Sequence, residues 1–271
     1  MRPRACPVEP GIELANRYVL RAWLGGGGNG TVYSAWDRKV GRSIAIKLFE
    51  PARTAGLEGT RRLEREVRLA RAVVHENVCP VFDLVAADGH WFMTMELAAR
   101  TLREDLDLKV ESPGETRWAR SARDARSVCA GLGAIHRLGI AHGDLTPRNI
   151  LRMGDGRLAL ADFGLARGAA DEPVTHGGTL NYLAPEVALG LAPDSRSDLW
   201  QLGIVLHEIL LGARPSWRMT DAGPVACLST SFDPPCEIAE LLAIAAACLA
   251  WNPALRPATA TDLLGPRSTR A

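Results

Sequence analysis

Three side chains in the middle of the chain have the types and spacing that phosphoryl transfer needs. Asp144 and Asn149 lie five positions apart (149 − 144) in the segment H-G-D-L-T-P-R-N, and Asp162 begins the segment D-F-G. This reaction needs an acceptor hydroxyl held in line and a divalent metal that offsets charge on the phosphates. A carboxylate at Asp144 can accept the hydroxyl proton, while Asn149 and Asp162 offer hard oxygen ligands to Mg²⁺. Turn residues and an Asx cap are the alternative, and the ordered co-occurrence of all three favours catalysis.

Gly25, Gly27 and Gly30 form a second candidate, because they have the spacing G-x-G-x-x-G. A loop without side chains brings backbone N–H groups close to phosphate oxygens. The alternatives are a flexible turn and a dinucleotide-binding turn, and the latter requires that a helix follow. Here residues 31–36 predict a strand, which favours a phosphate-covering loop between two strands.

Lys47 ends the segment A-I-K on a predicted strand, where residues two apart share a face. Ala45 is small enough to lie against an adenine ring, and Lys47 can contact phosphates. For an isolated segment of this kind, a lysine on a surface strand is the ordinary interpretation. Glu66 follows nineteen positions later (66 − 47), beside the apolar stripe of a predicted helix, where it can hold Lys47 by an ion pair. A solvated glutamate is the alternative.

The segments that must position these residues change character along the chain. Short segments rich in β-branched and aromatic residues predict strands over 18–23, 31–36, 43–49, 78–85 and 91–97. Between the third and fourth of these, residues 57–74 predict an amphipathic helix with the apolar stripe Leu63, Val67, Ala70 and Val74.

Helical patterns follow over 116–138, 197–211 and 238–249, interrupted by a hairpin-like stretch over 150–162. Strands first and helices afterwards predict an α+β fold. We expect an N-terminal lobe over 17–97 and a C-terminal lobe over 98–264, with a hinge near 96–99 and a ligand cleft between the lobes.

Composition narrows the class of protein. The chain has 271 residues, is 47% hydrophobic and 23% charged, and carries a net charge of +1. These values predict a globular protein and give no reason to expect nucleic-acid or membrane partners. The six cysteines lie far apart, which favours reduced thiols in a cytoplasmic protein over a zinc or redox site. Residues 1–11 lack the apolar region of a secretory signal, and the longest apolar run, 241–251, is too short to span a membrane.

In their order along the chain, these motifs resemble those of the Hanks-type, eukaryotic-like protein kinases, in particular bacterial serine/threonine kinases. The resemblance runs from about Tyr18 to Pro257. It includes G-T-L-N-Y-L-A-P-E at 178–186, similar to the end of the family's activation segment, and D-L-W-Q-L-G at 198–203, similar to the start of a family helix. Arg256 stands where the family pairs an arginine with the glutamate of A-P-E, here Glu186.

The resemblance implies a bilobal kinase fold, ATP and Mg²⁺ as cofactors, and a protein substrate. It implies that Asp144 orients the acceptor hydroxyl and that Asn149 and Asp162 bind the metal. Lys47, held by Glu66, would position the α- and β-phosphates beneath the glycine loop. The resemblance also implies an adenine site, with Val32 and Ala45 above the ring, Leu151 below it, Met95 at the back, and the backbone from Glu96 to Ala98 beside it. Ordinary core packing is the alternative role for the apolar side chains among these residues.

Two residues depart from the family pattern. Gly143 replaces the arginine that pairs with an activation-loop phosphate, so we predict that activity does not require phosphorylation of Thr175 or Thr179. Thr146 replaces a lysine near the transferred phosphoryl group, and losing one such preorganised group can cost about 10²–10³ in rate. An ATP-binding pseudokinase or scaffold therefore stays open as an alternative.

A small-molecule phosphotransferase is the other alternative, because glycine between the histidine and aspartate also occurs in aminoglycoside kinases. The A-P-E segment, which builds a platform for a peptide, favours a protein substrate instead. By resemblance, Thr179 and Pro147 favour serine or threonine as the acceptor. The sequence identifies neither the substrate nor the oligomeric state.

Overall fold

The computed structural model describes residues 8–27, 30–109, 115–163, 179–220, 223–227 and 233–263. The chain forms two compact units, each considered by itself. The first comprises Met1–Ala72 and Cys79–Ala98, and the second comprises Val73–Val78 and Ala99–Ala271. Across the described residues, none of the helices combines the length and the apolar character needed to cross a lipid bilayer.

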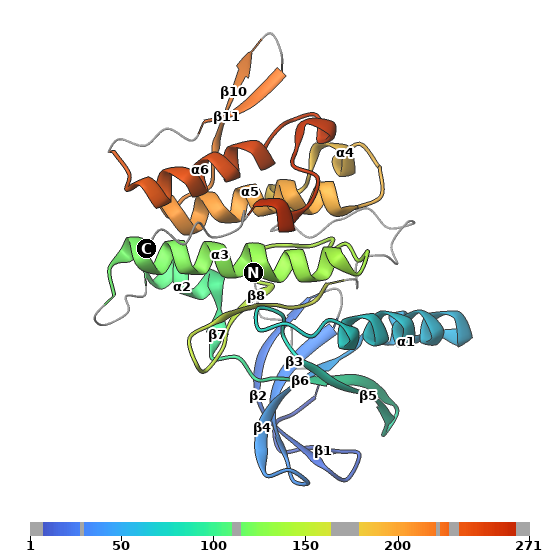
Figure 1. Ribbon diagram of the computed structural model, residues 1–271. Coiled ribbons are helices and arrows are strands. Elements are labelled where there is room, and N and C mark those ends of the chain that lie inside the picture. The colour runs from blue at the N-terminus through green and yellow to red at the C-terminus, as the bar shows by residue number, and fades with distance from the viewer. Residues whose placement is uncertain are drawn as a thin grey trace. The chain divides into compact units, whose positions relative to one another are not determined.

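The first unit contains a curled antiparallel sheet with the strand order β1-β2-β3-β4-β6-β5 (Figure 1). Its strands are β1 Glu13–Leu14, β2 Tyr18–Gly27, β3 Gly30–Asp37, β4 Arg42–Leu48, β5 Val81–Ala87 and β6 His90–Met95. Buried residues alternate with partly exposed ones along β3, as expected when one face of a strand covers a core.

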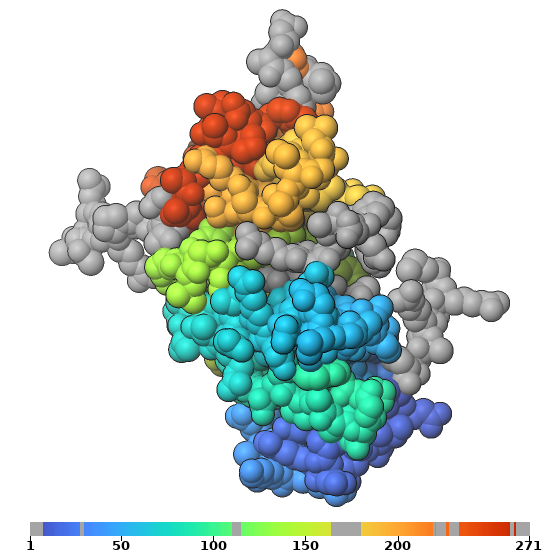
Figure 2. Space-filling view, turned by 90° about the vertical axis from the view of Figure 1, so that its right-hand side faces the viewer, coloured from blue at the N-terminus to red at the C-terminus, as the bar shows by residue number. Residues whose placement is uncertain are grey.

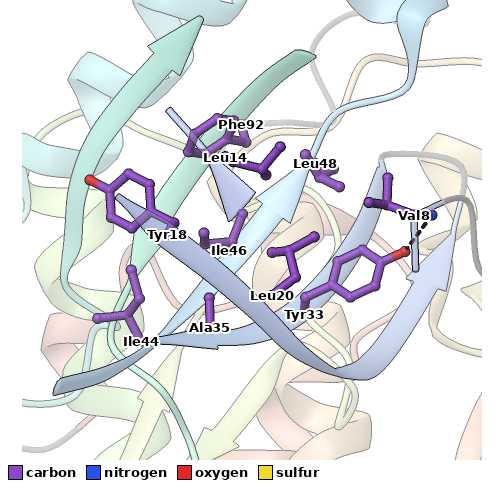
Figure 3. Packing of buried hydrophobic residues seen from close by; sticks show 10 residues of the cluster. All are labelled: Val8, Leu14, Tyr18, Leu20, Tyr33, Ala35, Ile44, Ile46, Leu48 and Phe92. Carbon is purple, nitrogen blue, oxygen red and sulfur yellow. Dashed lines mark hydrogen bonds between the residues drawn. The ribbon is translucent and has the colours of Figure 1, made fainter. Parts of the chain in front are cut away.

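Apolar side chains from five strands pack together on one face of this sheet (Figure 3). The rings of Tyr18 and Phe92 meet edge to face with centroids 5.7 Å apart, a favoured aromatic geometry. The hydroxyl of Tyr33 accepts a hydrogen bond from the backbone N–H of Val8 at 3.2 Å, so the buried phenol has a partner. The cluster comprises Val8, Leu14, Tyr18, Leu20, Tyr33, Ala35, Ile44, Ile46, Leu48 and Phe92.

A single long helix, α1 Gly56–Ala72, follows β4 after the short 3₁₀ helix η1 Pro51–Thr54. Its buried side is formed by Leu63, Glu66, Val67 and Ala70. The expectation that Val74 would continue this stripe is wrong, since the helix ends at Ala72 and Val74 is 91% exposed. In the space-filling view, the light-blue stretch that holds η1 and α1 forms part of the surface of the first unit (Figure 2).

The second unit is mainly helical. Its helices are α2 Leu102–Leu108, α3 Arg117–Arg137, α4 Pro185–Ala188, α5 Ser195–Leu211 and α6 Cys236–Cys248, with the short 3₁₀ helices η2 Thr179–Tyr182, η3 Pro253–Leu255 and η4 Ala260–Leu263. Helix α5 is buried along almost its whole length, and the polar residues Asp198, Gln201 and Glu208 are buried together with its apolar ones. It begins at a capping box on Asp194 and ends at Gly212, whose φ of 77° is the left-handed conformation that glycine adopts readily.

Two small sheets complete the second unit. One has the order β7-β8-β9, with β7 Arg100–Thr101, β8 Ile150–Arg152 and β9 Leu158–Leu160. The other is the hairpin of β10 Ser216–Thr220 and β11 Gly223–Cys227, which projects beyond α5 and α6 in Figure 1. Residues 73–78 cluster with this unit because the side chain of Asn77 donates to the carbonyl of Leu158 at 2.8 Å. The predicted boundary at residue 97 had placed them with the N-terminal lobe.

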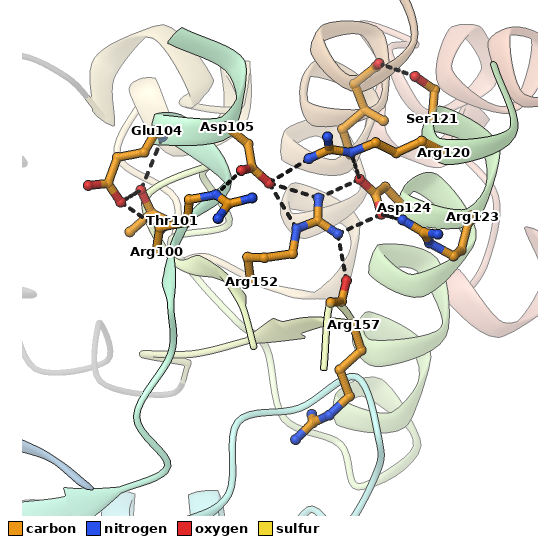
Figure 4. A network of polar contacts seen from close by, with 12 residues as sticks. Arg100, Thr101, Glu104, Asp105, Arg120, Ser121, Arg123, Asp124, Arg152 and Arg157 are labelled. Atoms are coloured by element: carbon orange, nitrogen blue, oxygen red, sulfur yellow. Dashed lines mark hydrogen bonds and ion pairs between the residues drawn. The ribbon is translucent and has the colours of Figure 1, made fainter. Parts of the chain in front are cut away.

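A buried ion network fixes β8, the strand that follows the candidate catalytic segment (Figure 4). Arg152, 4% exposed, donates to Asp105 on α2 at 2.8 Å and to Asp124 on α3 at 2.9 and 2.6 Å. Arg120 also reaches Asp105, at 3.0 Å. Buried charges of this kind are tolerated when each is paired and hydrogen-bonded. The network therefore ties β8 to two helices of the same unit.

Candidate active site

The segment that carries Asp144 has no regular secondary structure, and a buried carboxylate on α5 holds its backbone. Asp198 is fully buried. Its Oδ2 accepts the backbone N–H of His142 at 2.7 Å, and its Oδ1 accepts that of Gly143 at 2.7 Å. His136 Nε2 lies 2.9 Å from Oδ2. Hydrogen bonds to a charged acceptor are stronger than neutral ones, so Asp198 fixes this backbone in place.

The remainder of the segment is held in a similar way. Gln201, one turn further along α5, accepts the backbone N–H of Leu145 at 2.8 Å. Gly143 has a φ of 81°, in the left-handed region that favours glycine. Glycine at position 143 therefore suits this backbone conformation, although it carries no positive charge.

Asp144 and Asn149 lie in contact, as their spacing predicts. Asn149 Nδ2 donates to both the carbonyl oxygen and Oδ2 of Asp144, each at 2.8 Å. The turn between them is closed by the backbone N–H of Asn149, which donates to the carbonyl of Thr146 at 2.9 Å. Because the amide nitrogen of Asn149 faces Asp144, its Oδ1 is directed away from Asp144. Thr146 is 4% exposed and adds a hydroxyl, not a charge.

A backbone hydrogen bond joins the segment of Asp162 to that of Asn149. It follows β9 and has a φ of 60°, uncommon for a residue with a side chain and typical of functional positions. The preceding residue, Ala161, donates its N–H to the carbonyl of Asn149 at 2.9 Å, which brings the ends of the two motifs together. The side chain of Phe163 is buried, and its ring centroid is 6.1 Å from that of His142. Gly164, the last residue of D-F-G, lies outside the described residues, as does Thr175 of the activation segment.

His142 is fully buried, and desolvation is the main cause that lowers its pKa below the ordinary value. The nearby carboxylate of Asp198 opposes this shift. A neutral imidazole at pH 7 therefore supports the loop by packing, with its Nδ1 3.4 Å from the backbone nitrogen of Asp144.

In the first unit, the structure rules out the interpretation of Lys47 as a surface lysine. Lys47 is only 2% exposed and stands directly opposite Val32 in the β3–β4 register. Ala45, on the same face of the strand, is 3% exposed and stands opposite Met95 on β6. A lysine buried on a strand beside small and apolar residues is typical of a functional position, because burial of an ammonium is otherwise costly.

The glycine loop joins β2 and β3, with Gly25 opposite Val32 and Gly27 opposite Gly30. Gly30 has a φ of 137°, and a β-carbon there would lie 2.1 Å from the carbonyl oxygen of Leu48, so only glycine fits. A β-carbon on Gly25 or Gly27 would meet nothing within 4 Å. Gly25 and Gly27 therefore border open space at the loop surface, which suits the close approach of a phosphate.

Glu66 is buried, but the ion pair that it forms joins it to Arg53, with Oε2 2.7 Å from Nη2. Burial is the main cause that raises the pKa of Glu66, and the charges of Arg53, Arg62 and Lys47 oppose it. The interpretation of Glu66 as a solvated surface residue is wrong. Its pairing with Lys47 stays a prediction.

The predicted hinge and floor of the adenine site lie on separate units. In the first, the backbone N–H of Glu96 donates to the carbonyl of Pro80 at 3.0 Å, so a base would have to use other backbone groups between Glu96 and Ala98. In the second, Leu151 is half-buried on β8, opposite Thr101 on β7.

The ion pair expected of the A-P-E segment is confirmed. Arg256 Nη1 and Nη2 donate to the two carboxylate oxygens of Glu186 at 2.6 and 2.9 Å. The guanidinium also lies 5.1 Å from the ring centroid of Trp200, and its side chain is fully buried. A two-point pair of this kind fixes α4 to the C-terminal part of the unit.

Comparisons with known proteins decide the family. Residues 18–265 match the family model of the protein kinase domain. The chain belongs to the protein kinase family. The kinase domain of PknI from Mycobacterium tuberculosis, solved as a double mutant, aligns with a TM-score of 0.69 and 26% identity over 94% of this chain and 96% of that one. The predicted α+β kinase fold is thereby confirmed.

Several curated relatives are bacterial serine/threonine-protein kinases. Serine/threonine-protein kinase PknL of Mycobacterium bovis is 36% identical over 215 residues, which are 77% of this chain and 52% of that protein. The DNA damage-responsive serine/threonine-protein kinase RqkA of Deinococcus radiodurans is 38% identical over 218 residues, 77% of this chain and 32% of that protein. Serine/threonine-protein kinase PrkC of Bacillus subtilis is 31% identical over 210 residues, which are 76% of this chain and 32% of that protein. The chain thus spans about half or less of the length of these relatives, and the predicted resemblance to bacterial serine/threonine kinases is confirmed.

Three residues with clear structural roles at the site were not predicted. Asp198 and Gln201 were recognised only as parts of a helix motif, and their positions three and six residues after Ser195, the first residue of α5, gave no sign that they hold the backbone of the segment that carries Asp144. Arg53 carries no motif at all. Its signal was weak: an arginine in a short link between a strand that bears Lys47 and a helix that bears Glu66.

Proposed function

We propose that this chain is the catalytic domain of a serine/threonine protein kinase, which transfers the γ-phosphate of ATP to protein hydroxyls. One observation supports this most: Asp144 and Asn149 are hydrogen-bonded to each other on a backbone that α5 holds rigidly, and Asn149 is joined through Ala161 to the segment of Asp162. Family membership and the names of the relatives agree with it.

In this proposal Asp144 accepts the hydrogen of the substrate hydroxyl and directs its oxygen toward the γ-phosphorus. The hydrogen bond from Asn149 Nδ2 to Asp144 Oδ2 limits the rotation of that carboxylate. Positioning of this kind supplies much of the catalysis in phosphoryl transfer, which asks for little covalent chemistry from the protein.

The residues present also fit Mg²⁺. Among the described residues, no group of three or more His, Cys, Asp or Glu side chains could form a closed metal cage. Mg²⁺ instead prefers one or two protein oxygens together with water and phosphate oxygens. Asn149 Oδ1 and the carboxylate of Asp162 would hold it, and the metal would offset the negative charge that builds on the phosphates.

The first unit would bind the nucleotide itself. Lys47 would contact the α- and β-phosphates, and the backbone of the loop from Gly25 to Gly30 would cover them. For the adenine we assign Val32, Ala45 and Met95 from the first unit, the backbone between Glu96 and Ala98, and Leu151 from the second unit.

The substrate is proposed to be a protein, because Glu186 and Arg256 stabilise the segment that resembles a peptide platform. The same resemblance favours serine and threonine acceptors. A cytoplasmic location is supported by ATP as co-substrate and by free thiols at the five described cysteines. Thr146 favours one second candidate, an ATP-binding pseudokinase with little turnover, since its buried hydroxyl replaces a cation.

Separate measurements of binding and turnover test the proposal. Mg·ATP should raise the melting temperature of the wild-type chain, because a ligand that binds only the folded state stabilises it. Wild type should also transfer labelled γ-phosphate to a generic protein acceptor, and Asp144→Asn should not, although it should still bind Mg·ATP. A thermal shift without transfer by wild type would favour the pseudokinase.

A further inference from the structure

Glu66 is a buried carboxylate of which only one oxygen is satisfied. Its side chain is 7% exposed, and Oε2 lies 2.7 Å from Arg53 Nη2. No hydrogen bond reaches its Oε1 from the described residues. A buried acceptor left in this state costs free energy, more so when it is charged. The second oxygen of Glu66 therefore marks a position for another donor.

Arg53 comes from the link between the two elements that carry the predicted ion pair. It lies in η1, between strand β4, which holds Lys47, and helix α1, which holds Glu66. Its side chain is 18% exposed, and its guanidinium lies 6.0 Å from the ring centroid of Phe49. Arginine stays charged at all ordinary pH values and offers several donors in a fixed plane. It is thus a permanent partner for a carboxylate within its reach.

The two cations cannot both be served by Glu66 as it stands. Lys47 is buried in the same unit, yet Oε1 of Glu66 receives no hydrogen bond. For Oε1 to meet Lys47, the carboxylate must turn or α1 must shift, and either movement alters the 2.7 Å contact between Oε2 and Arg53. The two ion pairs are therefore coupled through one carboxylate.

We propose that Arg53 competes with Lys47 for Glu66, and that it is a positioning residue which sets the fraction of molecules whose lysine is held ready for the phosphates of ATP. This inference rests on the proposed function, in which Lys47 contacts those phosphates. The apparent affinity for a ligand falls in proportion to the fraction of competent molecules. Weakening the hold of Arg53 on Glu66 should therefore tighten the binding of ATP.

The test compares four forms of the full chain: wild type, Arg53→Gln, Arg53→Lys and the control Arg65→Gln. Arg65 is an exposed residue of α1, the helix that carries Glu66, so the control makes the same charge change in the sequence next to Glu66. The dissociation constant of Mg·ATP is measured by calorimetry, and KM for ATP and kcat by labelled phosphate transfer. Arg53→Gln should lower the dissociation constant and KM by about 3–10-fold, if about 10–30% of molecules are competent in wild type. Arg65→Gln should leave both unchanged.

Arg53→Lys protects the test against a failure to fold, because it keeps a positive charge beside Glu66 but loses the planar fork. It should tighten ATP binding in the same direction by a smaller factor. In a chain that already carries Glu66→Gln, adding Arg53→Gln should leave the dissociation constant of Mg·ATP unchanged, since the contested carboxylate is already gone. A merely structural role for Arg53 would not depend on Glu66 in this way.

Weaker or unchanged binding of Mg·ATP in both Arg53 variants, beside a wild type that binds it, would overturn the competition and leave the proposed function standing. A wild type that binds no Mg·ATP would overturn both. Tighter binding that persists after Glu66→Gln would also refute the inference, because Arg53 would then act by another route.

Discussion

Asp198→Asn tests whether one buried carboxylate holds the catalytic segment in place. Asp198 is fully buried, and it receives the backbone N–H groups of His142 and Gly143 at 2.7 Å each, with His136 Nε2 at 2.9 Å. Asparagine keeps one acceptor oxygen and places an NH₂ group where the second oxygen stood. One interior N–H group then loses its acceptor, and the remaining bond loses its charge.

The size of the effect follows from those contacts. A hydrogen bond to a charged group contributes about 1.5–3 kcal/mol, and a buried donor without an acceptor costs about 1–3 kcal/mol. One loss of each kind gives about 2.5–6 kcal/mol, a large share of the about 5–15 kcal/mol by which a domain is stable. Because Asp144 directly follows the two bonded backbone groups, phosphate transfer should fall as well.

The assay is equilibrium unfolding in urea at pH 7, followed by tryptophan fluorescence, with phosphate transfer measured in parallel. Asp194→Asn is the matched control, since it makes the same change on the same helix at an exposed N-cap. Asparagine caps a helix about as well as aspartate, so the control should change stability by about 0.5 kcal/mol at most. Equal unfolding midpoints for the Asp198 and Asp194 variants would refute the role assigned to Asp198.

Three further outcomes follow from the structure. Glu186→Gln should lower the free energy of unfolding by about 3–5 kcal/mol because it leaves the buried Arg256 without its charged partner, and a urea midpoint equal to wild type would contradict this. Burial raises the pKa of Glu66 above the ordinary 4.5, so the native state binds this proton more tightly than the unfolded state does. The free energy of unfolding of wild type, minus that of Glu66→Gln, should therefore fall as the pH rises above 4.5. A difference that stays flat or rises with pH would argue against this. Phosphatase-treated protein should turn over as fast as untreated protein, because Gly143 has no side chain to bind a phosphate on Thr175 or Thr179; loss of activity after treatment would exclude this.

Much of the fold could be predicted because its elements are encoded locally. The β-branched and aromatic residues of β3 and the periodicity of α1 are visible in the sequence itself. The end of α1 was not predicted, since the stripe that stops at Ala70 continues in the sequence as far as Val74. Helix α2 was missed although the segment T-L-R-E carries a capping box, in which Thr101 and Glu104 bond reciprocally. That signal would have revealed it.

The contact between Asp144 and Asn149 could be predicted for a different reason. Asp144 and Asn149 lie in one turn, so their contact depends on a spacing that the sequence prints directly. Asp198 bonds a backbone 56 residues away, and Arg53 reaches Glu66 across a link and almost three turns of helix. Contacts of this kind depend on how the elements pack, and neither residue type nor spacing reveals them.

Transfer of labelled γ-phosphate from Mg·ATP, to the chain itself and to a generic protein acceptor, tests the central claim most directly. Wild type and Asp144→Asn are assayed together, and Mg·ATP binding is confirmed for both by thermal shift. The account predicts transfer by wild type, none by the variant, and a thermal shift in both. Equal transfer by the two proteins, or a thermal shift without any transfer by wild type, would contradict it.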